Sequence, residues 1–294
     1  MRAAILIGIL AGAIACTPAS GNEPGSPADL KTDLEDYLKA QFTYVIDLQG
    51  FYIVSSDEPP LHASPESVSA EEAAIYAADI FAAMLDQNND GRIDRPRLLE
   101  SLRKHLVFGI GYERTLEKHE EYVERNLDRY MMSMKTDIWD LQLDFEKFEI
   151  EPGEALNSST WRPPGTGALR EEAYHTITEA MRYYNSAWSF DRGSKLHTWM
   201  AADRKRGLYD TEEQNIEEDG QYDDATAVNE LIHQVWIFDQ AGAADQLTAN
   251  QKRILKLIRR SGLDLNVNGR RDGRRLYKIY ECARGNCAIR RAQP

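Results

Sequence analysis

Residues 86–97 read DQNNDGRIDRPR, and the spacing of oxygen-bearing side chains in this stretch decides the expected fold. Aspartate or asparagine occupies the first, third, fifth and ninth places, so these side chains can bring their oxygens to one point. Glycine at the sixth place permits a sharp turn that a residue with a Cβ atom resists. The candidate ligands are Asp86, Asn88, Asp90, the carbonyl oxygen of Arg92, and Asp94. Together they predict a site for a hard dication.

A helix is predicted on each side of this loop. Ser69 and Glu72 have the spacing of a capping box, and apolar residues recur at helical intervals over residues 73–84. On the far side, Pro96 occupies the first turn of a second helix, and an apolar stripe follows over residues 98–106. The sequence therefore predicts helix, loop and helix in succession.

This arrangement resembles the EF-hand family of calcium-binding proteins. The chain departs from the family at the twelfth place of the loop, where the family has a bidentate glutamate and this sequence has Arg97. The resemblance implies calcium as the bound ion. The missing ligand implies weak binding, with a dissociation constant on the order of 10⁻⁴ to 10⁻³ M, so calcium is expected to act as a structural ion.

A second loop near the C-terminus repeats the pattern. Its candidate ligands are Asp264, Asn266, Asn268 and Asp272, and Arg275 occupies its twelfth place. Arginines surround its two carboxylates, so Coulomb repulsion opposes a dication there. A simple Asn-Gly turn explains the same residues equally well. We therefore expect the first loop to be the competent calcium site.

The start of the chain has the pattern of an export signal. Arg2 precedes an uncharged apolar run over residues 3–15, which is too short to span a bilayer. Cys16 follows directly, so the segment also resembles the lipobox of bacterial lipoproteins, and residues 17–27 have the composition of a flexible tether. The resemblance implies lipidation at Cys16 and anchoring to a membrane of the cell envelope, with ordinary cleavage and free secretion as the alternative.

The three cysteines are consistent with this location. Lipidation of Cys16 leaves Cys282 and Cys287, which we expect to form a disulfide in an oxidising compartment. Two cysteines without a nearby histidine are too few for a structural zinc site.

Charge is distributed unevenly along the chain, whose formal net charge is −13. Residues 210–224 contain eight acidic side chains and no basic one, a pattern more typical of a solvated loop than of a cation or partner site. Residues 251–294 instead carry 13 Lys or Arg against three acidic residues. This basic segment is expected to fold back on the acidic body or to contact anionic components of the envelope. No nucleic-acid partner is expected.

The remaining patterns favour a mostly α fold made of EF-hand-like helix–loop–helix pairs in two halves. Residues 113–135 read as one long amphipathic helix, and residues 136–147 and 239–247 as degenerate loops that lack most ligands. The expected divisions are a signal peptide (1–15), a tether and N-terminal segment (16–63), an EF-hand-like domain (64–153), a linker (154–167) and a second helical, possibly EF-hand-like domain with a basic tail (168–294).

No catalytic pattern is found around the six histidines. His175 and Glu179 lie one helical turn apart, but the HExxH motif is absent and they read as a solvated helix pair. His197 and His233 lie beside apolar helical faces, where a core or surface histidine is ordinary. Nucleophile-elbow, phosphate-loop and catalytic-cysteine motifs are also absent. The expectation is a protein that is not an enzyme.

Two alternatives stay open. In the first, the chain is an EF-like scaffold or interaction lipoprotein that no longer binds calcium, with Arg97 folded back on Asp86 or Asp90. In the second, it is an envelope enzyme that uses a carboxylate pair which no sequence motif signals.

Overall fold

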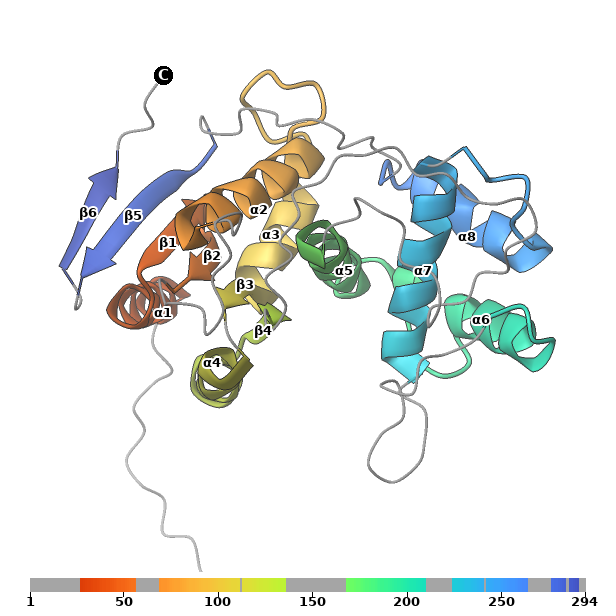
Figure 1. Ribbon diagram of the computed structural model, residues 1–294, viewed down its shortest axis with the longest axis horizontal. Helices are drawn as coiled ribbons and strands as arrows, with labels where there is room; N and C mark the ends of the chain where they lie inside the picture. The colour runs from red at the N-terminus through yellow and green to blue at the C-terminus, as the bar shows by residue number, and fades with distance from the viewer. Residues whose placement is uncertain are drawn as a thin grey trace, which may run out of the picture.

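Within the described residues, six strands form one mixed β-sheet in the order β4-β3-β2-β1-β5-β6 (Figure 1). The computed structural model describes residues 27–56, 69–111, 113–135, 168–209, 224–240, 242–263, 276–283 and 286–290. The strands are β1 (Tyr44–Leu48), β2 (Phe51–Ser55), β3 (Leu106–Gly111), β4 (Tyr130–Lys135), β5 (Lys278–Ala283) and β6 (Asn286–Arg290).

A tight hairpin joins β1 to β2. Gln49 and Gly50 occupy its two-residue loop with φ of 51° and 95°, the positive values that match the twist of the flanking strands. Strands β2, β3 and β4 run parallel to one another, whereas β5 pairs antiparallel with both β1 and β6. The C-terminal hairpin therefore extends a sheet that the N-terminal part of the chain begins.

Helices cover both faces of this sheet. Phe51 and Ile53 of β2 pack into the apolar core formed with α2 and α3, while Tyr52 and Val54 pack into the core formed with α1 and α4. Burial on both faces explains why β2 is apolar along its length instead of alternating with polar residues. The four helices are α1 (Pro27–Gln41), α2 (Ala70–Leu85), α3 (Pro96–His105) and α4 (Glu113–Leu127).

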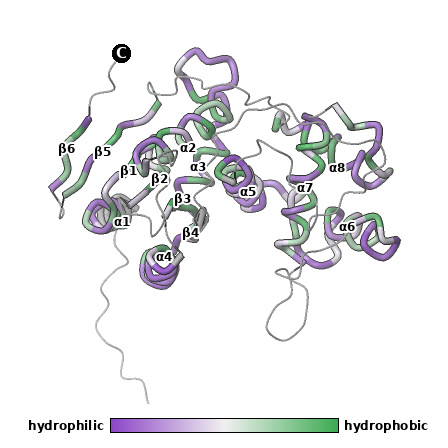
Figure 2. The backbone as a smooth tube through the Cα atoms, viewed as in Figure 1, coloured by the Kyte–Doolittle hydropathy of each residue, from purple (hydrophilic) through white to green (hydrophobic). Residues whose placement is uncertain are grey.

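A helical layer packs beside α2 and α3 and extends away from the sheet (Figure 1). Buried apolar residues of α5 and α7, two helices that carry green, hydrophobic segments in Figure 2, continue the core of α2 and α3 without interruption. Helix α5 contacts α2, α3, β3 and β4 as well as α7. The layer consists of α5 (Ala168–Arg182), the short 3₁₀ helix η1 (Ser186–Trp188), α6 (Lys195–Lys205), α7 (Asp224–Gln240) and α8 (Ala249–Arg260).

The predicted mostly α fold of paired EF-hand halves is therefore wrong. Residues 113–135 were expected to form one helix. In the structure the helix ends at Leu127, and residues 130–135 form β4, which pairs in register with β3. The end of the predicted second helix, from Leu106, is likewise strand β3. Strand β3 is buried along nearly its whole length and lacks the alternation that marks a half-buried strand, so periodicity alone did not separate it from helix.

The C-terminal hairpin carries the cysteine pair expected from the sequence. Cys282 and Cys287 are disulfide-bonded across β5 and β6. Arg290 on β6 forms ion pairs with Glu281 and with Glu71 at the start of α2. Through Glu71, this part of the basic segment thus contacts an acidic group of the body.

Several expectations fall outside the described residues. They concern lipidation at Cys16, the tether, the degenerate loop at 136–147, the linker at 154–167, the acidic stretch 210–223, and the second loop with Asp264, Asn266, Asn268 and Asp272. Among the described helices, none is both long enough and apolar enough to cross a membrane. Envelope anchoring through Cys16 stays a prediction.

Candidate metal centre

Helices α5 and α7 bring two carboxylates and two imidazoles together. Glu171 and His175 lie one turn apart on α5, and Glu230 and His233 lie one turn apart on α7, so each pair projects from one side of its helix. The apolar faces of the two helices hold them together, with Ile177 of α5 and Ile232 of α7 fully buried in the shared core. We call Glu171, His175, Glu230 and His233 the α5–α7 cluster.

The four groups are spaced as ligands of one ion are spaced. Their candidate ligand atoms all lie within 4.8 Å of one another. Nε2 of His175 is 3.3 Å from Oε1 of Glu230 and 3.9 Å from Oε1 of Glu171, and Nδ1 of His233 is 3.4 Å from the same Glu171 oxygen. Tetrahedral ligands at ~2.1 Å from zinc are about 3.4 Å from each other. The observed separations therefore leave room for an ion with little movement of the side chains.

The two histidines of this cluster are unusual because their side chains are almost completely buried. His175 is 4% exposed and His233 is 2% exposed. Within the described part of the chain, neither ring nitrogen of His175 has a hydrogen-bond partner, and Nε2 of His233 has none. A buried polar atom without a partner costs about 1–3 kcal/mol, so such atoms call for an explanation. A metal ion that accepts an imidazole lone pair would supply one.

The electrostatics of the cluster favour a positive charge at its centre. Burial lowers the pKa of His175, but the carboxylates of Glu230 and Glu171 outweigh burial, and the pKa lies well above its usual value. Burial likewise raises the pKa of Glu171 and Glu230, yet the adjacent histidines hold both carboxyls below their usual range. The carboxylates of the cluster thus favour a positive charge among the four groups.

The surroundings of the cluster fix its side chains. Tyr174 stacks on Trp236 with ring centroids 4.4 Å apart, and the Trp236 ring also lies 5.8 Å from that of His233. Nδ2 of Asn229 donates to the backbone carbonyl of His175 across the two helices. These contacts hold α5 and α7 in a fixed relation, which a preorganised ion site requires.

A cavity of about 640 Å³ opens beside the cluster. His175 and Glu230 form part of its wall, and the remainder comes from α4, β4, the rest of α5 and α7, and Phe190. Glu172 also lines the cavity, and burial raises its pKa to about 7. The cluster therefore lies at the boundary between the protein core and a polar hollow.

The loop at 86–97 has the local shape expected from the sequence. It connects α2 to α3, and Gly91 at its sixth place has φ of 83°. Asp86 accepts hydrogen bonds from the backbone N–H groups of Asp90 and Gly91 at 3.1 and 2.8 Å, while Asp94 accepts from Gln87 at 2.9 Å. Its carboxylates are thus satisfied by the backbone of the loop.

The loop carboxylates are less tightly gathered than the α5–α7 cluster. Among the described residues, Asp86, Asp90 and Asp94 do not form a group with the close spacing of that cluster. Arg97 is exposed, and no ion pair between described residues joins it to Asp86 or Asp90. The structure thus does not show the contact on which the calcium-free scaffold alternative was based.

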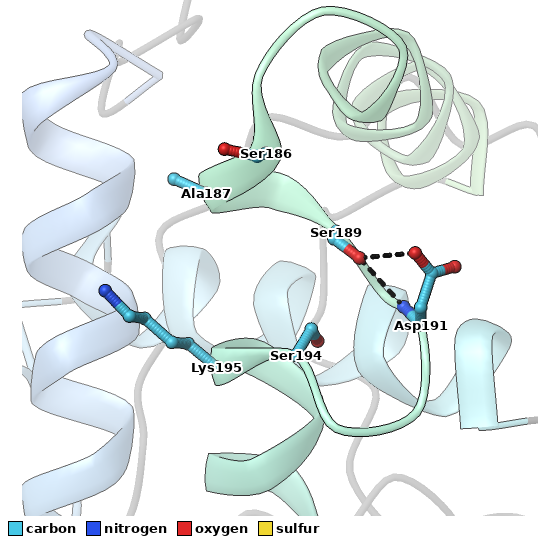
Figure 3. Close-up of a pocket in the computed structure, with 6 residues that line it drawn as sticks. All are labelled: Ser186, Ala187, Ser189, Asp191, Ser194 and Lys195. Atoms are coloured by element: carbon cyan, nitrogen blue, oxygen red, sulfur yellow. Dashed lines mark hydrogen bonds between the residues drawn. The ribbon is translucent and has the colours of Figure 1, made fainter.

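A shallower pocket of about 450 Å³ lies between η1 and the start of α6 (Figure 3). Ser189 donates to the carboxylate of Asp191 and accepts from its backbone N–H, while Lys195 extends away from them. His197 hydrogen-bonds to Gly193 and lies 3.1 Å from Asp224 instead of approaching Ser189. The hydroxyl and the imidazole are therefore not arranged as a nucleophile and its base.

Sequence reasoning paired His175 with Glu179, but the structure pairs Glu179 with Arg182 and brings His175 to Glu171 and Glu230. His233, expected to be an ordinary histidine beside an apolar face, belongs to the cluster. The two glutamates were missed. A usable signal was the spacing of Glu171 from His175 and of Glu230 from His233, since each pair places a carboxylate and an imidazole on one helix face.

Comparison with protein-family models, curated proteins and solved structures finds no match to this chain.

Proposed function

We propose that this chain is a metal-binding protein whose main site is the α5–α7 cluster, and that the ion is a transition-metal dication of the zinc class. The observation that carries the proposal is the imidazole of His175, which is buried beside two carboxylates without a hydrogen bond from either ring nitrogen in the described structure. Two nitrogen and two oxygen ligands suit zinc and its first-row neighbours. Calcium takes oxygen ligands instead.

Charge balance supports the same conclusion. With neutral imidazoles, Glu171 and Glu230 place two negative charges in a largely buried space. Buried charges are costly unless they are paired or coordinate a metal, and a dication neutralises both carboxylates at once.

Zinc titration of the purified chain after chelation tests this proposal. We expect one ion per chain, and we expect His175→Ala and His233→Ala each to weaken binding by more than about 100-fold, because loss of outer partners alone costs 10–100-fold. His197→Ala is the matched control, since this histidine lies on α6 and contacts Asp224. Glu230→Gln removes the carboxylate charge but keeps the side-chain shape, so weaker zinc binding by this variant would not be explained by misfolding.

Equal zinc affinity in the wild type and all four variants would refute the proposal. A stable, folded wild-type chain that takes up no zinc would refute it as well.

A second candidate function is weak calcium binding by the loop at 86–97. The helix–loop–helix connection and the positive φ of Gly91 favour it. Arg97→Glu restores the missing bidentate ligand and removes a positive charge, so it should tighten calcium binding by roughly tenfold or more. Calorimetry that detects no calcium binding in either form would favour the calcium-free scaffold.

A further inference from the structure

The position of the cluster in the cavity wall bears on how its ion is coordinated. His175 and Glu230 line the cavity, whereas Glu171 and His233 do not. An ion held among the four groups therefore borders the cavity on the side of His175 and Glu230. Structural zinc sites are closed by four protein ligands, but zinc in functional sites keeps or gains a position for an outside ligand.

The cavity is strongly acidic. Its lining includes five glutamates, Glu120, Glu124, Glu172, Glu179 and Glu230. Arg182 is the basic residue of the lining, and Glu179 binds its guanidinium with both oxygens at 3.0 and 2.8 Å. Glu230 is a ligand of the proposed ion, and burial raises the pKa of Glu172 to about 7, so the charge that makes the cavity disfavour anions comes mainly from Glu120 and Glu124 of α4.

Aromatic side chains add a second cation-favouring feature. Tyr130 and Tyr183 line the cavity and are each 47% exposed, although aromatic rings of this size are usually more buried, and the Tyr183 ring keeps one face beyond its stack on His105. Phe190, a third lining residue, already has the Arg182 guanidinium 4.7 Å from its ring centre. Aromatic faces beside carboxylates are a setting in which organic cations bind.

We propose that the ion of the α5–α7 cluster adds a fifth ligand from the side of this cavity, and that this ligand is an organic cation that offers a neutral nitrogen or oxygen donor to the metal. This inference rests on the proposed function. The metal takes the donor group, the acidic lining holds the positively charged part, and anionic ligands are excluded. Amine-bearing molecules are the chemical class that fits both requirements.

The test uses the full chain loaded with Co²⁺, whose visible absorption reports on coordination. Three probes share one imidazole donor and differ in charge: histamine is cationic, imidazole is neutral near pH 8, and imidazole-4-acetate is anionic. We expect each step in charge to change affinity by about tenfold, in the order histamine, imidazole, imidazole-4-acetate.

Matched variants of α4 separate the role of the cavity from that of the metal. Glu120→Gln with Glu124→Gln removes two lining carboxylates and should weaken histamine binding at least threefold without changing Co²⁺ affinity. Glu117→Gln with Glu121→Gln removes the same charge from exposed positions of α4 that do not line the cavity, and should change neither.

The outcomes are distinguishable. Failure of the chain to bind Co²⁺ or Zn²⁺ would overturn the proposed function and this inference together. Normal Co²⁺ binding with a spectrum that none of the probes alters would overturn the inference alone, because the site would then be closed. An equal affinity for the three probes, or an equal effect of the two double variants, would overturn the assignment of a cationic ligand.

Discussion

The loop at 86–97 and the α5–α7 cluster both gather carboxylates, but they satisfy them in different ways. In the loop, backbone N–H groups donate to Asp86 and Asp94, so the conformation holds without an ion. In the cluster, the backbone hydrogen bonds are made within two helices, and among the described residues the ion-pair contacts of the four side chains are with one another. A metal would therefore add little to the shape of the loop but would satisfy polar atoms in the cluster that lack partners.

The largest expected effect is on the thermal stabilisation of the chain by zinc and by calcium, which should depend on different sites. Zinc at 100 times its dissociation constant should stabilise the chain by about 2.7 kcal/mol, and calcium at ten times its constant by about 1.4 kcal/mol. Glu171→Gln should abolish the zinc shift and preserve the calcium shift, whereas Asp86→Ala should do the reverse. Thermal melting with each ion measures both.

A variant that loses both responses would contradict the independence of the two sites. Loss of the zinc shift in Asp86→Ala alone would place the zinc site in the loop.

The second prediction concerns how the loop is attached to the helical layer. Arg95 and Gln87 donate to the backbone carbonyls of Ser261 and Gly262 just after α8. Gly262 has φ of 60°, and a Cβ atom there would displace the end of the Arg95 side chain, which would then give up its hydrogen bond to Ser261. We therefore expect Gly262→Ala to destabilise the chain by about 2 kcal/mol in urea unfolding.

Gly207→Ala is the matched control for this substitution. Its φ is 66°, but nothing lies within 4 Å of the added Cβ atom, so only the backbone cost of about 1 kcal/mol should appear. Equal destabilisation by the two substitutions would show that the contact with Arg95 contributes nothing.

The sequence predicted what depends on neighbours along the chain. The capping box of Ser69 and Glu72, the end of α2 before the loop and the start of α3 at Pro96 are all present. Each depends on residues within a few positions of one another, so spacing alone carries the signal. The turn at Gly91 follows for the same reason.

The sheet and the cluster could not be predicted in this way, because they depend on distant partners. β5 becomes a strand by pairing with β1, which lies near the other end of the described chain. Glu171 and His233 meet only because apolar faces of α5 and α7 pack together. The spacing along either helix reveals only two of the four residues, and such a pair cannot be distinguished from an ordinary pair of side chains on a helix surface.

The smallest expected effect tests whether the cluster depends on how α7 is anchored at its start. Asp224 begins α7 and is bound by Arg192 and His197. Burial raises the pKa of Asp224, but these hydrogen bonds outweigh burial, and the pKa lies below its ordinary value of 3.8. Because the folded pKa is the lower one, the stabilisation is present above pH 3.8 and is lost as the pH falls through the folded pKa.

Asp224→Asn should therefore lower stability at pH 7 by less than about 1 kcal/mol, as is usual for ion pairs near the surface. The difference from the wild type should shrink as the pH falls below 3.8. Urea unfolding across pH measures this, with the exposed Asp245→Asn as control. Zinc affinity should be unchanged, because packing between α5 and α7 sets the cluster. A parallel loss of zinc affinity in Asp224→Asn would instead show that the contact with α6 positions the ligands of α7.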